Sequence, residues 1–187
     1  MNLYVVRHGQ VPSNLEGRIS GWNNEALTPK GIEQASQIRN QLQCIKIDKI
    51  YSSPVYRAMQ TAKIIAPQGI EIISDPRLAE REPGSMLGKP RTLINKSEWN
   101  ALDKDITSEG SETLRAGLKR VKSFLDEIHL KDENKTVLVV THNFISKCIW
   151  ILEKHIQSPE KINDFFHKND EIKCYLERFA ERDFDGR

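Results

Sequence analysis

The chain has 187 residues, of which 38% are hydrophobic and 29% charged, and its 28 Lys and Arg against 26 Asp and Glu leave a formal net charge of +2. So small a net charge excludes a global field that would attract nucleic acid or an anionic membrane. No apolar run approaches the roughly 20 residues that span a bilayer. Arg7 and His8 also interrupt the N-terminal apolar segment too early for a secretory signal.

The cysteines and the absence of linkers bear on compartment and domain organisation. Cys44, Cys148 and Cys174 are widely spaced and form no CxxC pair, which is typical of reduced thiols in a cytoplasmic chain. The sequence has no repeat, low-complexity tract or Gly/Ser linker. We therefore expect one domain over residues 1–187, and the sequence gives no indication of oligomeric state.

Segments typical of strands and of helices alternate along the chain. Strands are expected at residues 2–6, 47–53, 70–74, 135–140 and 173–179, and helices after Thr28-Pro29, after Ser53-Pro54, after Ser111, near 144–156 and from Pro159. The first of these helices carries Ile32, Ala35, Ile38 and Leu42 on one face. Because the strands are mostly apolar throughout, we expect an α/β fold, a three-layer α/β/α sandwich with a mostly parallel central sheet.

Two segments lack this order. Residues from Ser85 to Ser108 show no clear periodicity, so we interpret them as a loop with short irregular helices and a natural place for a lid. The last seven residues, ERDFDGR, are expected to be a frayed tail.

Histidine and arginine follow the strands at their carboxyl ends. The first strand runs into Arg7 and His8, and the fourth runs into Thr141 and His142. Arg57 follows the second strand, in the first turn of the next helix. The third strand leads to a loop that holds Glu80, Arg81 and Glu82. Ligands of open parallel sheets bind beyond the carboxyl ends of the strands, so these side chains are expected to converge at one edge.

These residue types suit phosphoryl transfer. Guanidinium groups bind phosphate oxygens bidentately and remain charged. A histidine oriented through one ring nitrogen can attack with the other, and Gly9 can turn tightly and offer its carbonyl to the ring of His8. His142, if protonated, would stabilise the charge of the transferring group. Glu80 could protonate the leaving alkoxide, a contribution of about 10²- to 10⁴-fold, although Glu82 could do so instead.

The motifs also resemble a known family over nearly the whole chain. The matching blocks are RHGQ with Asn14, GRISGWNNEALTPKG (17–31), YSSPVYRAMQTA (51–62), LAEREPGSMLG (78–88), EGSE (109–112) and VVTHN (139–143). Together they resemble the histidine phosphatase superfamily, in its phosphoglycerate mutase-like branch. The resemblance implies that His8 is the phosphorylated nucleophile and Glu80 the proton donor, and that the phosphate is held by Arg7, Arg57 and His142.

Further residues take expected roles from the same resemblance. Asn14 matches a position that contacts the phosphoryl group, and Ser20 and Gly21 match positions that line the substrate pocket. Asn143 stands where the family usually has glycine, so its side chain is expected to narrow the pocket. No cofactor belongs to this chemistry, and two arginines beside the histidines would repel a metal ion.

The resemblance leaves a phosphatase and a mutase as alternatives. Mutases of this branch carry a longer insert after the Glu-Arg pair, with adjacent arginines, whereas only 28 residues separate Glu80 from Glu109 here and no Arg-Arg pair lies among them. This favours a phosphatase whose partner is a small phosphorylated metabolite, without nucleic acid or membrane. Lys89 or Arg91 could meet a second anionic group of the substrate. A non-catalytic phosphate-binding module is a third reading, and spacing assigns no role to His129, His155 or His167.

Overall fold

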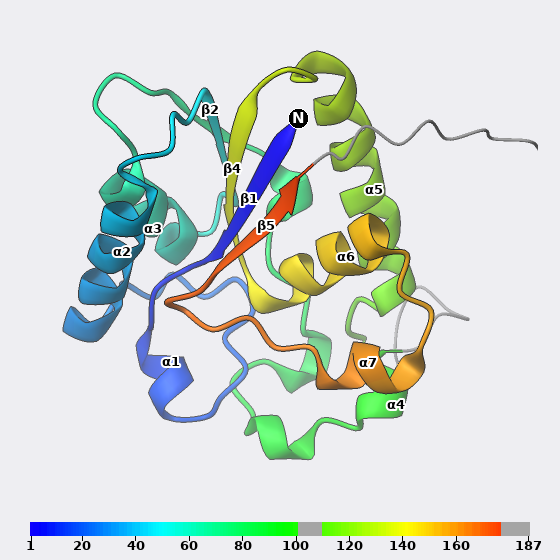
Figure 1. The fold of residues 1–187 in the computed structure, drawn as a ribbon. Helices are drawn as coiled ribbons and strands as arrows, with labels where there is room; N and C mark the ends of the chain where they lie inside the picture. Colours follow the sequence, from blue (N-terminus) through cyan, green and yellow to red (C-terminus); the bar gives the residue numbers. More distant parts are fainter. Residues whose placement is uncertain (101–109, 177–187) are drawn as a thin grey trace, which may run out of the picture.

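A computed structural model describes residues 1–100 and 110–176, which form a five-stranded sheet covered by helices (Figure 1). The strands are β1 (Asn2–Arg7), β2 (Lys49–Ser52), β3 (Ile72–Ser74), β4 (Thr136–Thr141) and β5 (Ile172–Leu176). The helices are α1 (Pro12–Leu15), α2 (Pro29–Leu42), α3 (Tyr56–Ile65), α4 (Lys96–Trp99), α5 (Leu114–Lys131), α6 (Asn143–Lys154) and α7 (Pro159–Asp164), with 3₁₀ turns η1 (Pro76–Leu78), η2 (Gly84–Met86) and η3 (Arg91–Leu93).

The strand order is β3-β2-β4-β1-β5. Three of the four strand pairs are parallel, and β5 alone runs antiparallel, beside β1. The mostly parallel sheet that the apolar strands predict is therefore confirmed.

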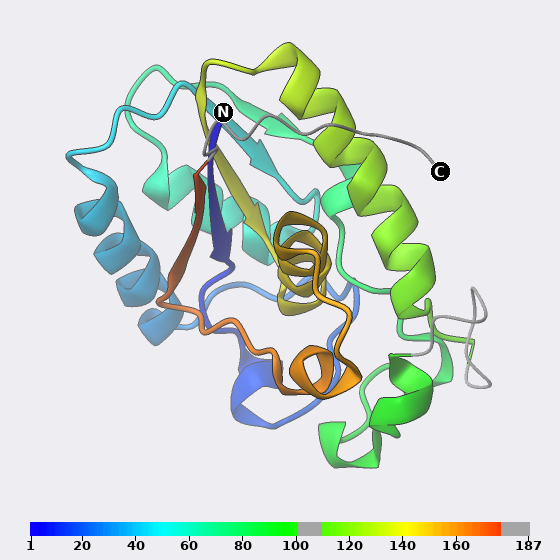
Figure 2. The same cartoon turned by 45° about the vertical axis from the view of Figure 1, so that its right-hand side comes forward.

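The helices lie on both faces of the sheet (Figure 1, Figure 2). One core cluster joins α2 and α3 to the first face through Ala35, Ile38, Ala58 and Ala62. The other joins α5 and α6 to the opposite face through Val121, Phe124, Ile145 and Ile149. Burial of apolar side chains on both faces explains why the interior residues of β1 and β4 are mostly apolar. The predicted three-layer arrangement is confirmed.

Several helix starts differ from the sequence prediction. Thr113 caps α5 by accepting from the Ala116 backbone, whereas Ser111, the predicted cap, donates to the carbonyl of Pro83. Helix α3 begins at Tyr56, because the hydroxyl of Ser53 accepts from the Val55 backbone N–H and holds a turn before the helix. Thr28 caps α2 as predicted.

Ile32 does not join the buried face of α2 that its spacing predicts, and 44% of its surface is exposed. The buried face instead contains Gly31, Gln34, Ala35, Ile38 and Leu42. Gln34 is buried because its side-chain oxygen accepts from the Gln10 backbone N–H. The buried face of α2 therefore includes a polar contact of Gln34 where the sequence predicts an apolar contact of Ile32.

The aperiodic segment after Ser85 contains short turns and one short helix, as predicted, up to residue 100. Backbone hydrogen bonds tie it to the connection between α1 and α2: Ile19 donates to Lys89, Gly88 to Ile19, and Arg91 to Gly17. The rest of the proposed lid, the predicted strand residues 177–179 and the proposed frayed tail lie outside the described residues. Among the described helices, none is both long and apolar enough to cross a membrane.

Candidate active site

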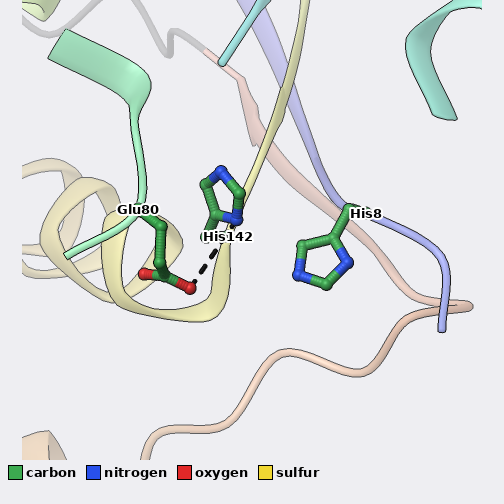
Figure 3. Close-up of side chains that lie close together, drawn as sticks. All are labelled: His8, Glu80 and His142. Carbon is green, nitrogen blue, oxygen red and sulfur yellow. Dashed lines mark ion pairs between the residues drawn. The ribbon is translucent and has the colours of Figure 1, made fainter. Parts of the chain in front are cut away.

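The register of β1 against β4 places two histidines side by side. Arg7 pairs with Thr141 across the parallel strands, and the His8 backbone N–H donates to the carbonyl of Thr141 at 2.9 Å. His8 and His142, each one residue farther on, therefore lie next to one another, with ring centroids 5.1 Å apart and ring planes inclined by 57°. Figure 3 shows the two rings and the carboxyl group of Glu80 around one space.

His8 is buried and its ring is oriented through one nitrogen. Nδ1 lies 2.8 Å from the carbonyl oxygen of Gly9. Because a carbonyl only accepts, Nδ1 carries the proton and Nε2 is the unprotonated nitrogen, whose lone pair accepts from Nε of Arg57. Burial, and then the charges of Arg57 and Arg7, hold the pKa of His8 well below 6.5. The ring is thus neutral at neutral pH.

The turn after His8 requires glycine. The Gly9 N–H donates to Thr61 Oγ1 at 3.0 Å, which fixes the turn to α3. A Cβ at Gly9 would lie 2.4 Å from the carbonyl oxygen of Gly31, in the first turns of α2. Close packing of two glycines therefore holds the carbonyl that orients His8.

Arg57 is fully buried at the start of α3 and contacts both histidines. Its Nε donates to Nε2 of His8 at 3.1 Å, and its Nη2 lies 3.2 Å from Nδ1 of His142. Nη2 also donates to the carbonyl of Gly21 at 2.8 Å. Burial lowers the pKa of Arg57 from its usual value, but a guanidinium remains charged at neutral pH. The site is therefore built around a buried cation.

His142 is held from the other side. Its Nε2 lies 2.8 Å from the Ser53 hydroxyl, and its Nδ1 accepts from Arg57. Nε2 therefore carries the proton of the neutral ring. Burial, followed by the charges of Arg57 and His8, holds the pKa of His142 well below 6.5. A dianion in the site would oppose the effect of these charges and favour protonation of Nδ1.

Arg7 supplies a second buried cation. Its Nη1 donates to the carbonyl of His167 at 2.9 Å, and its Cζ lies 5.2 Å from the ring centroid of Phe166. Burial, followed by the charge of Arg91, lowers the pKa of Arg7 to about 10, so it remains charged at neutral pH. Its Nε is buried and has no hydrogen-bond partner among residues 1–100 and 110–176. That N–H is available to an anion.

The two candidate acids are placed differently. Oε2 of Glu80 lies 3.6 Å from Nδ1 of His142 (dashed line in Figure 3) and 3.9 Å from Nη2 of Arg57. The indole N–H of Trp22 donates to the Glu80 carbonyl and steadies its backbone. Glu82 is exposed and accepts from the Gly84 backbone. Geometry therefore favours Glu80.

The four predicted substrate-contacting residues divide into two groups. Ser20, Gly21 and Asn143 line a cavity of about 80 Å³ that also contacts Glu80. Gly21 has a φ of +48°, and a Cβ there would lie 2.6 Å from Pro83. The side-chain oxygen of Asn14 accepts from the Val11 backbone and caps α1, so the structure gives Asn14 a local role.

The sequence predicts no role for Arg81, a further residue of this cavity. Arg81 is buried between the rings of Trp99 and Phe144, and its Nη1 has no hydrogen-bond partner within the described residues. Arg91 lines the cavity too, whereas Lys89, the other candidate for a second anionic group, does not. The motif that contains Glu80 also contains Arg81, but nothing in the neighbouring sequence indicates that the Arg81 side chain is buried.

One atom from each of His8, Glu80 and His142 lies within 4.8 Å of the other two, a spacing that a metal ion could use. The donor set does not fit a metal ion, however. The Arg57 guanidinium already lies within 4 Å of all three side chains and would repel a cation. Two buried arginines favour an anion here.

Comparison with known proteins identifies the class. Residues 3–176 match the model of the histidine phosphatase superfamily (branch 1), so the chain belongs to this superfamily. It is 32% identical over 162 residues to "Probable phosphoglycerate mutase GpmB" of Enterobacter sp. (strain 638), covering 80% of this chain and 73% of that protein. It is 31% identical over 149 residues to "Phosphoserine phosphatase 1" of Hydrogenobacter thermophilus, covering 76% and 71%.

The fold has solved counterparts. A phosphoserine phosphatase of Entamoeba histolytica in complex with 3-phosphoglyceric acid superimposes with a TM-score of 0.82 at 28% identity, over 94% of this chain and 90% of that one. The α-ribazole phosphatase of Shigella flexneri gives 0.79 at 23% identity, over 93% and 89%, and shares the fold. The α/β/α arrangement and the family resemblance of the motifs are both confirmed.

Proposed function

We propose that this chain is a metal-independent phosphatase that hydrolyses a small phosphomonoester through a phosphohistidine at Nε2 of His8. The observation that carries the proposal is the orientation of His8, whose Nδ1 is held by Gly9 so that the unprotonated Nε2 faces Arg57. A neutral, oriented imidazole beside fixed cations is what nucleophilic attack on a phosphate requires.

When the phosphate group binds, the hydrogen bond from Arg57 to His8 is replaced by one from Arg57 to the phosphate. The phosphoryl oxygens accept from Arg7 and Arg57, and Nε of Arg57 leaves His8 for the anion. The lone pair of His8 is then free to attack phosphorus. The anion also favours a proton on Nδ1 of His142, which donates to the phosphoryl group as it transfers.

The reaction proceeds in two balanced steps. Nε2 of His8 forms a bond to phosphorus while the ester P–O bond breaks, and Glu80 gives its proton to the leaving oxygen. Glu80, now a carboxylate, takes a proton from a water molecule that attacks the phosphohistidine. The N–P bond breaks, inorganic phosphate leaves, and His8 and protonated Glu80 are restored.

The cavity beside Glu80 supports a small substrate with a second negative group. Arg81 and Arg91 contribute cations to its lining, beside the carboxyl group of Glu80. The charge of Arg91 also contributes to lowering the pKa of Arg7 and His8, so its field reaches the reaction centre. We therefore favour a phosphomonoester that carries a second acidic group.

A mutase is the second candidate, because the relatives include proteins named as probable phosphoglycerate mutases. Both activities begin with the phosphohistidine and differ in the acceptor, which is water for a phosphatase and a substrate hydroxyl for a mutase. Product analysis separates them, since free phosphate indicates hydrolysis and an isomer without free phosphate indicates a mutase.

The experiment is a panel of phosphomonoesters in EDTA, scored for released phosphate and isomerised product, together with trapping of the intermediate from ³²P-labelled substrate. The wild type should retain label after an alkaline denaturing quench and lose it in acid. His8→Ala should retain none, and His129→Ala, on α5 away from the site, should match the wild type. Full labelling of His8→Ala would contradict the proposal, and a rate no greater than that of buffer across the panel would favour a non-catalytic module.

A further inference from the structure

The connection between α7 and β5 lies against the carboxyl end of β1, although the two are about 160 residues apart in the chain (Figure 1). Phe166, His167 and Asn169 of this connection each contact the Arg7-His8 pair. His167 is completely buried at its centre. The phosphoryl-transfer steps above make no use of it.

The His167 ring has a partner on each nitrogen. Nε2 lies 2.9 Å from the carbonyl oxygen of Glu171, and Nδ1 lies 2.6 Å from the Ser146 hydroxyl on α6. The carbonyl only accepts, so Nε2 carries the proton and Nδ1 accepts from Ser146. The neutral ring thus connects the start of β5 to α6 and fixes the conformation of the backbone between them.

That backbone in turn holds the site. The carbonyl of His167 accepts from Nη1 of Arg7 at 2.9 Å, and its N–H donates to Oδ1 of Asn143 at 2.7 Å. The side-chain amide of Asn169 donates to the carbonyl of His8. One short segment therefore contacts three of the residues that surround the reaction centre.

The contact with Arg7 matters most, because a guanidinium is planar and one fixed nitrogen largely sets the direction of the others. With Nη1 held by His167, the Nε of Arg7 stays buried and without a partner among the described residues. An arginine without this anchor could rotate away from the space between the histidines. Errors of about 1 Å in such positioning can cost 10²-fold in rate.

We infer that His167 is a positioning residue. The hydrogen bonds of its ring to Ser146 and Glu171 fix its backbone, and its carbonyl then holds Arg7 in the orientation that binds the phosphoryl group. This inference rests on the proposed function for its ligand, an oxyanion bound between His8 and Arg7. It also accounts for the asparagine at 143, whose side-chain oxygen binds the His167 N–H.

The charged groups around the ring are few. Arg7 faces it from β1, Glu171 from the connection and Lys173 from β5, and burial is the main reason that the pKa of His167 falls to about 4. The Glu171 carboxylate accepts from the Lys168 backbone and pairs with Lys173 at 2.7 Å. The ring is therefore neutral at pH 7 and retains this hydrogen-bonding pattern.

The test measures the affinity for inorganic phosphate by calorimetry, which needs no turnover. His167→Ala should raise the Kd about tenfold or more and raise KM for a phosphomonoester in parallel. His167→Gln places an amide nitrogen near Nε2, keeps the donor to Glu171, and should recover part of the loss. Ser146→Ala, a milder change that removes only the bond to Nδ1, should raise the Kd a few-fold and provides a second measurement if His167→Ala fails to fold.

Two controls separate positioning from general stability. His129→Ala, a histidine of α5 whose Nδ1 contacts the Leu125 carbonyl, should leave the Kd unchanged. In an Arg7→Lys background, where the guanidinium contact is absent, His167→Ala should change the Kd by less than twofold. Melting temperatures are recorded for every variant, so that affinities are compared only between folded proteins.

The outcomes are distinct. An unchanged phosphate Kd in both folded His167→Ala and Ser146→Ala, or an equal loss with and without the Arg7→Lys substitution, would overturn the positioning role and leave the proposed function standing. A wild type that binds no phosphate in the millimolar range would overturn both. Parallel loss of affinity in the two variants of this hydrogen-bond network, dependent on Arg7, would support the inference.

Discussion

Nε of Arg57 donates a hydrogen bond to Nε2 of His8 across 3.1 Å, so the buried guanidinium engages the atom that would attack phosphorus. The same side chain reaches His142 and the carbonyl of Gly21. Arg57 therefore links His8, His142 and the wall of the cavity. An entering phosphate must take over the hydrogen bond that Arg57 makes to His8.

Replacement of Arg57 by lysine tests this exchange. Lysine keeps the charge but loses the planar fork that contacts three groups at once. We expect kcat/KM for a phosphomonoester to fall about 10²- to 10³-fold, as for loss of other preorganised donors. Arg39→Lys, at an exposed position of α2, is the matched control and should retain full activity. A loss below threefold in Arg57→Lys would show that charge alone suffices.

Substrates with different leaving groups can show whether Glu80 or Glu82 is the proton donor. Glu80→Gln should lower kcat/KM, which reports transfer of the phosphoryl group to His8 and not the later attack of water, about 10²- to 10⁴-fold for an alkyl phosphate, whose leaving alkoxide needs a proton. The loss should shrink markedly for p-nitrophenyl phosphate, since nitrophenolate leaves without one. Glu82→Gln should match the wild type on both substrates, because Glu82 is exposed and contacts the Gly84 backbone. Equal losses on both substrates in Glu80→Gln would argue against a proton donor.

Arg91 provides a test of the substrate class. Its guanidinium lines the cavity beside Glu80, and its Nε donates to the carbonyl of Arg18. Arg91→Ala should raise KM about tenfold for esters that carry a carboxylate and by less than twofold for an uncharged alkyl ester. Lys89→Ala, which removes a nearby exposed cation outside the cavity, is the control. An equal rise for both kinds of ester would remove Arg91 from substrate selection.

The parts of the site that follow from the sequence are those placed at strand ends. The apolar strands before Arg7 and Thr141 predict one edge for both histidines, and parallel pairing then sets them side by side. The family motifs mark Arg57 and Glu80 in the same way. At these positions the local sequence pattern and the order of the strands in the sheet lead to the same placement, so the sequence alone is enough to predict it.

The contacts of His167 could not be predicted in this way. Its hydrogen bond to Arg7 joins residues 160 positions apart and uses a backbone carbonyl, which leaves no mark in the residue types. The cap of α5 fails for a different reason, because Ser111 and Thr113 are both good cap residues and only the tertiary contact of Ser111 with Pro83 separates them. Long-range polar contacts decide both cases.

The buried histidines predict acid sensitivity of the fold. The pKa values of His8 and His142 lie well below 6.5 and that of His167 is about 4, whereas each would titrate near 6.5 in the unfolded chain. Below about pH 6.5 the unfolded state therefore binds more protons than the folded state, and the free energy of unfolding decreases as the pH is lowered from there. Each histidine contributes a slope approaching about 1.4 kcal/mol per pH unit.

Urea denaturation at pH 7.5, 6.5, 5.5 and 5.0 measures this slope. His167→Gln removes one titrating group, so its free energy of unfolding should depend less steeply on pH than that of the wild type. Added phosphate should offset part of the loss by binding the folded state. A free energy of unfolding that stays constant between pH 6.5 and 5.0 would contradict neutral burial of these rings.

Gly31 tests how closely α2 must approach the turn after His8. Alanine in place of glycine within a helix ordinarily adds about 0.5–1 kcal/mol of stability. Here a Cβ would lie 2.2 Å from the carbonyl oxygen of Gln10, so the turn or the helix must move. We expect Gly31→Ala to lower the free energy of unfolding by about 1–3 kcal/mol, as in other overpacked sites, and to lower kcat because the carbonyl of Gly9 shifts.

Ser36→Ala on the exposed part of α2 is the control for this substitution, since the Ser36 hydroxyl donates to the Ile32 carbonyl within the same helix. Urea denaturation and kcat are measured for both variants. Because the crowding acts on the backbone that orients His8, the fall in kcat should persist at temperatures where Gly31→Ala is fully folded. The ordinary gain in stability with unchanged kcat would mean that the turn relaxes without moving the nucleophile, and the close glycine pair would then have no role in catalysis.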